Sequence, residues 1–103
     1  MISKDVESVD REVERLIRDL RHRRPGAGPV DAARRLAQVF ADTEADLAGR
    51  PRREVPRLAD RAVADQVAVT WRELRDALLA AEIADADTLR VAVADVRARL
   101  ASG

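Results

Sequence analysis

Large apolar side chains recur along the first part of this chain at alternating steps of four and three residues. They run from Ile2 to Leu20, with steps of 4, 3, 4, 3 and 4 residues. Such a repeat places all of these side chains on one face of an α-helix, whereas a half-buried strand would need steps of two. The pattern predicts a helix over 3–24 that ends before Pro25 and Gly26. Its apolar positions are Ile2, Val6, Val9, Val13, Leu16 and Leu20.

Three further segments show helical spacing, over 29–48, 56–81 and 86–101. Pro29 suits the first turn of the second helix, and Gly49 suits the position just after its end. No glycine or proline marks the break near 82–85, so residues 56–101 could also form one continuous helix. The apolar stripes are Val30, Ala33, Leu36, Ala37, Phe40 and Leu47; then Leu58, Ala62, Val63, Val67, Trp71, Leu74 and Leu78; then Leu89, Val93, Val96 and Leu100.

These segments together predict an all-α fold. The 103 residues form a single helical domain, 1–103. Four amphipathic helices with short connections favour an antiparallel four-helix bundle, or three long helices if 56–101 is continuous. The chain has no cysteine, so disulfides are excluded. Its large apolar side chains are few for a domain of this length, and we therefore expect it to self-associate.

The charges beside the first apolar stripe indicate what that helix packs against. Its flanks carry Asp5, Glu12 and Asp19, which would repel the same flanks of a second copy. An arginine-flanked helix is a better partner. The first helix is therefore expected to pack inside its own bundle, or against the third or fourth helix of another chain. Those two helices carry Arg61, Arg72 and Arg75, and Arg90, Arg97 and Arg99.

Few residues of this chain could carry out chemistry. It has no cysteine or tyrosine and one histidine, His22. A closed zinc site needs four ligands and a di-iron bundle needs two Glu-x-x-His motifs, so one histidine predicts neither. The serines lie near the termini, outside any nucleophile-elbow motif. We expect no catalytic residue, no metal and no cofactor, which favours a non-catalytic protein over an enzyme.

Apolar stripes without reactive side chains favour a small protein–protein interaction or oligomerisation module. The expected partner is a second copy or another helical protein. Trp71 would serve as an anchor if it is exposed, because tryptophan is enriched among interface hot spots. The candidate interface residues are Val6, Val9, Val13, Leu16, Leu20 and Trp71.

A basic segment supports a first alternative, a nucleic-acid-associated accessory or antitoxin-like protein. Arg50, Arg52, Arg53 and Arg57 fall within eight residues and could contact phosphates. No aromatic residue is interleaved for base stacking. Basic and acidic residues number 19 each, so overall charge does not favour nucleic acid. Pairing with neighbouring acidic residues is the other interpretation of these arginines.

Residues 6–17 give a second alternative, a small all-helical mutase-type enzyme. The stretch from Val6 to Ile17 resembles the first helix of the all-helical chorismate mutases. The resemblance implies an intertwined helical dimer whose site uses an arginine late in that helix and a lysine beyond it. Lys4 is the only lysine of this chain.

No apolar run approaches the roughly 18 residues that a membrane-spanning helix needs. The first residues, Met1 to Asp5, lack the apolar stretch of a signal peptide. From the sequence we therefore expect a cytoplasmic protein that does not enter a membrane.

Overall fold

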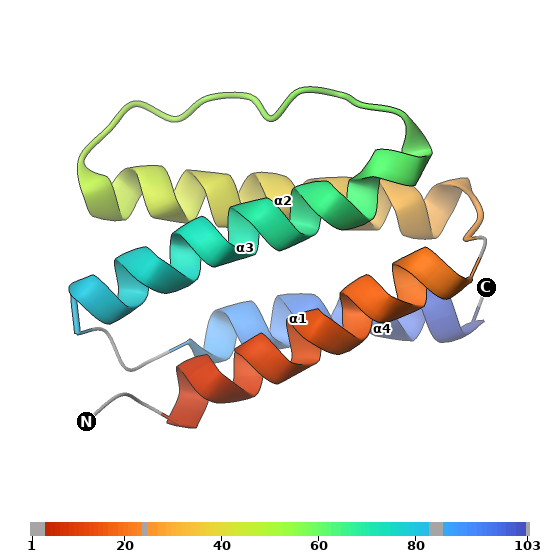
Figure 1. Cartoon of the computed structure of the whole chain (residues 1–103), viewed down its shortest axis with the longest axis horizontal. Coiled ribbons are helices and arrows are strands. Elements are labelled where there is room, and N and C mark those ends of the chain that lie inside the picture. Colours follow the sequence, from red (N-terminus) through yellow and green to blue (C-terminus); the bar gives the residue numbers. More distant parts are fainter. Residues whose placement is uncertain (1–3, 24, 83–85, 103) are drawn as a thin grey trace.

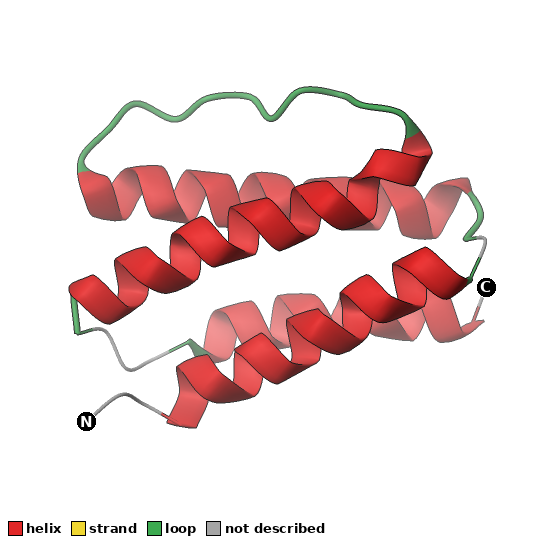
Figure 2. Ribbon diagram, viewed as in Figure 1, coloured by secondary structure: helices red, strands yellow, loops and turns green. Residues whose placement is uncertain are grey.

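The computed structural model describes residues 4–23, 25–82 and 86–102 of the chain. These residues form the α-helices α1 (Lys4–His22), α2 (Ala27–Ala48), α3 (Val63–Ala80) and α4 (Asp87–Ser102). A short 3₁₀ helix, η1 (Asp60–Ala62), leads into α3, and no strand occurs in the part of the chain that is described. The predicted all-α bundle is confirmed (Figures 1 and 2).

Helix α2 ends at the glycine that the sequence predicts for this position. Gly49 adopts the left-handed conformation, with φ of 68°, which costs a glycine little because it has no Cβ. The N–H of Arg50 then donates to the carbonyl of Ala45 at 2.9 Å. This bond satisfies a carbonyl that the helix end would otherwise leave open, as in a Schellman motif.

The helices α3 and α4 are separate, although no glycine or proline divides them. The N–H of Ala81 still bonds to Ala77, and Glu82 then takes the left-handed conformation with φ of 55°. This change of direction ends α3, and α4 begins at Asp87. The alternative of one continuous helix over 56–101 is therefore wrong, and Asp85, a suggested cap of the last helix, lies outside the described residues.

Helices α2 and α3 run in the same direction, because the chain crosses back over the bundle between them (Figure 1). We call Arg50–Ala59 the crossover segment. At about 1.5 Å per residue, the 22 residues of α2 are about 33 Å long. Ten extended residues at about 3.3 Å each cover that distance. The segment is thus just long enough to return the chain to the start of α2.

Each helix packs against two of the other three. Helix α1 contacts α3 and α4, and α2 contacts the same pair. Helices that follow each other along the sequence, α1 and α2 or α3 and α4, therefore lie diagonally across the bundle. Of the neighbouring pairs, α1–α3 and α2–α4 are antiparallel, while α2–α3 and α1–α4 are parallel (Figure 1).

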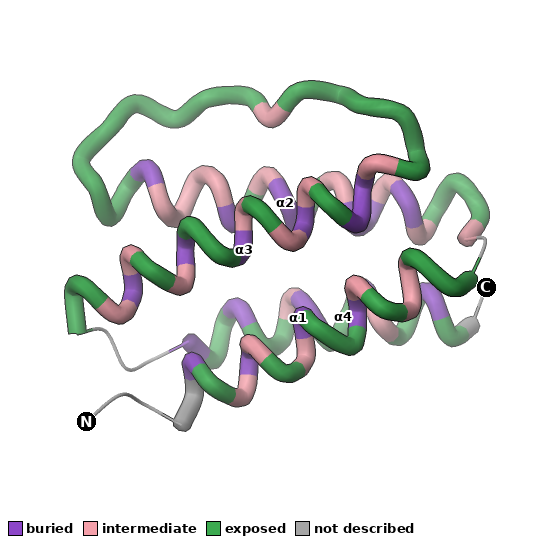
Figure 3. Tube along the Cα trace, in the orientation of Figure 1, coloured by how far each residue is buried: buried purple, intermediate pink, exposed green. Residues whose placement is uncertain are grey.

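The core is built from the predicted stripes, which turn inwards from all four helices (Figure 3). At its centre the ring of Phe40 from α2 packs against Trp71 from α3, with 5.3 Å between ring centroids and an angle of 51° between ring planes. Such tilted pairs are favourable because the positive edge of one ring meets the negative face of the other. Phe40 is fully buried and Trp71 is 3% exposed.

Two apolar residues assigned to the buried stripes are exposed instead. Leu58 is 47% exposed and Leu47 is 37% exposed. Leu58 was expected inside a helix beginning near Pro56, but the helical conformation begins only at Asp60. Residues 56–59, which include Leu58, belong instead to the extended crossover segment that spans the bundle. Leu47 lies in the last turn of α2, two residues before the chain leaves the helix.

The acidic flanks of α1 meet the arginines of α3 and α4, as predicted. The carboxylate of Asp10 lies 3.3 Å from the guanidinium of Arg75. On the other side, Glu12 pairs with Arg97, which also lies 4.0 Å from Asp19. The first helix thus packs inside its own bundle, between the two arginine-bearing helices.

Candidate functional site

The stripe predicted as an interface on the first helix lies in the core of the chain. Of the six candidate interface residues, five on α1 and Trp71 on α3, five are at most 3% exposed, and Leu20 is partly buried. A second chain could reach these side chains only if α3 or α4 moved away. An interface between copies through this stripe stays a prediction that requires the bundle to open. The five buried residues are Val6, Val9, Val13, Leu16 and Trp71.

The arginines of the crossover segment pair with acidic residues of α2. Arg50 bonds to Glu44. Arg52 donates two hydrogen bonds to Asp46, of 3.0 and 2.7 Å. Nucleic-acid phosphates would have to displace these carboxylates.

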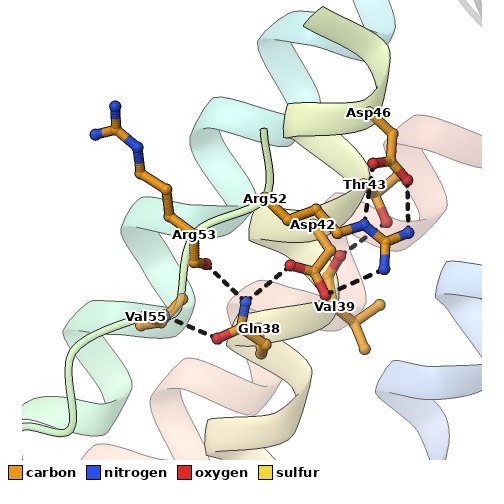
Figure 4. A network of polar contacts seen from close by, with 8 residues as sticks. All are labelled: Gln38, Val39, Asp42, Thr43, Asp46, Arg52, Arg53 and Val55. Carbon is orange, nitrogen blue, oxygen red and sulfur yellow. Dashed lines mark hydrogen bonds and ion pairs between the residues drawn. The ribbon is translucent and has the colours of Figure 1, made fainter. Parts of the chain in front are cut away.

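The two remaining arginines of the segment are held less closely. The guanidinium of Arg57 lies 3.9 Å from Asp31 of α2. The side chain of Arg53 has no ion pair with any described residue and extends away from α2 (Figure 4). Arg53 is therefore the one arginine of this segment that a partner could reach without breaking a contact within the described part of the chain.

Gln38 of α2 holds the middle of the crossover segment (Figure 4). Its side-chain oxygen accepts from the N–H of Val55 at 2.8 Å, and its side-chain nitrogen donates to the carbonyl of Arg53 at 2.9 Å. That nitrogen also donates to Asp42 at 2.8 Å. One amide thus satisfies a donor and an acceptor of an extended backbone that has no neighbouring strand.

Replacing Gln38 with alanine should release the middle of the segment. Two hydrogen bonds to the backbone are lost, each contributing about 0.5–1.5 kcal/mol. We expect the amide of Val55 to exchange with deuterium at least about tenfold faster, while amides in the middle of α1 keep their rates. Gln38→Glu is the matched control, because it keeps the acceptor for Val55. Equal exchange rates in the wild type and in Gln38→Ala would show that Gln38 does not hold the segment.

The hydrogen bonds from Arg52 lower the pKa of Asp46, with a smaller contribution from the positive charge itself. The charged carboxylate is favoured in the folded protein, so this interaction stabilises the fold above the unfolded pKa of aspartate. It is lost as the pH falls through the lowered pKa, in the acid range below about pH 4. Arg52→Gln is expected to raise the pKa of Asp46 towards its ordinary value, as followed by carboxyl NMR titration. An unchanged midpoint would mean that the pair does not persist in solution.

A cavity of about 640 Å³ opens between the crossover segment and α3. We call it the crossover groove. Its apolar surface includes two large exposed side chains, Leu58 at 47% and Val69 at 49%. The side chain of Gln66 links the two walls of the groove, because it donates to the carbonyl of Pro56. The groove therefore has fixed walls, a helix on one side and an anchored segment on the other.

Carboxylates dominate the charges around this groove. Glu54, Asp65 and Glu73 line it, against the single positive charge of Arg53. Asp65 is paired with Arg21 at 2.8 Å. Glu54 and Glu73 have no ion pair among the residues that the structure describes. The groove thus offers an apolar floor with two negative charges and one positive charge that are unpaired among the described residues.

The residues that sequence reasoning missed here are Val69 and Gln38. Val69 falls between the stripe positions Val67 and Trp71, and an apolar residue off the stripe is the signal that marks it. Gln38 carried no such signal, because its role depends on where residues 53–55 lie.

The described residues were also compared with what a metal site and a membrane-spanning helix require. His22 is exposed at the end of α1. Within 4–23, 25–82 and 86–102, no group of three metal-ligating side chains comes together. None of the described helices combines the length and apolar character needed to cross a bilayer.

Comparisons of this chain with models of protein families, with curated proteins and with solved structures found no match. The resemblance of residues 6–17 to the chorismate mutases stays a prediction from that stretch alone.

Proposed function

We propose that this protein is a non-catalytic interaction module that binds an apolar segment of another protein in the crossover groove. The observation that carries the proposal is the exposure of Leu58 and Val69 in one cavity of about 640 Å³. Exposed apolar residues are common singly, but two large ones sharing a cavity form a surface that gains free energy when it is covered.

The charges of the groove indicate which charges the partner segment should carry. Glu54 and Glu73 favour lysine or arginine beside the apolar anchor, at the end of the groove where the crossover segment begins. The partner segment is therefore apolar with basic residues at one end.

A displayed peptide library selected against the folded protein tests this proposal. We expect enrichment of peptides with one or two large apolar residues and lysine or arginine on one side of them. Their affinity should fall at least about tenfold for Val69→Asp, because a charge then replaces the apolar contact. Val91→Asp is the matched control, since Val91 is 58% exposed on α4 and lies outside the groove.

Three outcomes would contradict the proposal. One is the absence of any enriched sequence. Another is a set of binders that tolerate Val69→Asp as well as Val91→Asp. The third is a dimer in sedimentation that Val69→Asp dissociates, since the occupant of the groove would then be a second copy.

A further inference from the structure

A second cavity lies at the end of the bundle where α1 ends and α2 and α3 begin. Its volume is about 370 Å³, and we call it the end cavity. Side chains of all three helices line it, which the parallel course of α2 and α3 makes possible. This size is at the lower end of the range for small-molecule sites, about 300–1,000 Å³.

The polar wall of the end cavity is mainly positive. Arg21, Arg23 and Arg61 line it, against one carboxylate, that of Asp60. Arg21 is engaged by Asp65 at 2.8 Å. Arg23 and Arg61 have no ion pair with the described residues. Two guanidinium groups therefore remain available, and their planar forks suit a carboxylate or a phosphate.

The negative charge of Asp60, the one carboxylate lining the cavity, is compensated by Arg34. Asp60 accepts a hydrogen bond of 2.6 Å from Arg34, whose side chain is only 12% exposed. Two further nitrogens of Arg34, Nε and Nη1, are buried without a hydrogen-bond partner. Arg34 thus cancels the charge of Asp60, and the free arginines of the wall set its sign.

The N-termini of two helical segments add to the positive electrostatic potential of the end cavity. Both α2 and the η1–α3 unit begin here, and neither N-cap residue, Gly26 or Ala59, makes a side-chain capping bond. Helix N-termini carry partial positive charge and free N–H groups. Helix α1 contributes its negative end, but Arg21 and His22 occupy its last turn.

The other walls are apolar and include Leu20, Val30 and Val63. Val30 and Val63 are almost fully buried in the fold, so the partly buried Leu20 is the one of the three that a ligand can contact appreciably. An inorganic ion would leave Leu20 uncovered, whereas a small molecule with an apolar body would cover it.

From these observations we propose that the end cavity binds a small organic anion, a phosphate or carboxylate group on an apolar body, through Arg23 and Arg61. This site is separate from the crossover groove and does not depend on the proposed partner. The anionic group lies against the two free guanidinium groups, and the apolar body lies against Leu20.

Titration of the full chain with phenyl phosphate, inorganic phosphate and benzyl alcohol tests the site, by calorimetry and by amide chemical shifts. We expect phenyl phosphate to bind with the highest affinity and to shift amides around 20–30 and 60–64. The double variant Arg23→Gln and Arg61→Gln should weaken this binding at least about tenfold, because each charge-assisted hydrogen bond is lost. Arg11→Gln with Arg72→Gln is the matched control, since these exposed arginines lie outside the cavity.

Several results would overturn the assignment. Inorganic phosphate binding as tightly as phenyl phosphate would contradict the apolar contribution. Equal affinity in the two double variants would show that Arg23 and Arg61 do not hold the anion. Absence of saturable binding of phenyl phosphate at millimolar concentration would exclude the site. Circular dichroism establishes that each variant is folded before it is compared.

Discussion

Replacing Phe40 with alanine is expected to lower the free energy of unfolding by about 3–5 kcal/mol. The ring is fully buried and packs against Trp71 with 5.3 Å between centroids. Its removal costs the transfer free energy of the ring and leaves a hole that a close-packed core fills poorly. A domain of this size is stable by only about 5–15 kcal/mol. One substitution therefore removes a large part of its stability.

Urea unfolding followed by circular dichroism measures this effect. Val91→Ala is the control, because Val91 is 58% exposed and surface changes stay within about 0.5 kcal/mol. A Phe40→Ala variant as stable as this control would mean that α2 and α3 do not share the core described here.

Removing the carboxylate of Asp10 should also have a large effect, about 1–3 kcal/mol. Asp10 of α1 accepts a hydrogen bond of 2.7 Å from the indole Nε1 of Trp71 and lies 3.3 Å from Arg75. Because Trp71 is 3% exposed, its N–H has little access to water. Asp10→Ala would leave that donor without a partner, which costs more than the net value of the bond.

A double-mutant cycle separates the two roles of Asp10. Asp10→Asn keeps an acceptor for Trp71 and loses the charge opposite Arg75, so it should destabilise less than Asp10→Ala. Once Trp71→Phe has removed the donor, Asp10→Ala should cost distinctly less than it does in the wild type. If the two substitutions add without coupling, the bond between α1 and α3 does not contribute in solution.

The features that local spacing controls were predictable from the sequence. The stripe from Val6 to Leu16 follows from helical periodicity, and the left-handed Gly49 follows from what the end of a helix requires. The packing of the acidic first helix against the arginine-bearing third and fourth helices followed from matching charged flanks, and in the structure Asp10 pairs with Arg75 and Glu12 with Arg97. Each of these conclusions needs only the residues along one helix face.

Features that depend on the path of the chain between helices were not predictable in the same way. Short connections favour antiparallel neighbours, yet the segment from Arg50 to Ala59 crosses the whole bundle and makes α2 and α3 parallel. The arginines and prolines of this segment do not indicate what distance along the bundle it spans. The later start of the third helix and the exposure of Leu58 both result from that path.

The crossover groove and the end cavity also result from the path of the chain between helices. The basic segment was recognised from its composition, and the pairing of Arg50 and Arg52 with acidic residues a few positions earlier is a local property. The crossover groove and the end cavity each join residues from segments far apart in the sequence, such as Arg23 and Arg61. Their formation requires α2 and α3 to begin at the same end of the bundle.

Distance measurements on paired labels test this parallel arrangement most directly. The chain has no cysteine, so labels can be attached at Ala27→Cys with Arg61→Cys, and at Ala48→Cys with Arg61→Cys, in samples diluted with unlabelled protein. The structure predicts a short distance for the 27/61 pair and a distance of roughly 30 Å for the 48/61 pair, which spans the length of α2. The reverse order, with 48/61 the shorter pair, would show that α2 and α3 are antiparallel and would contradict the fold and both proposed sites.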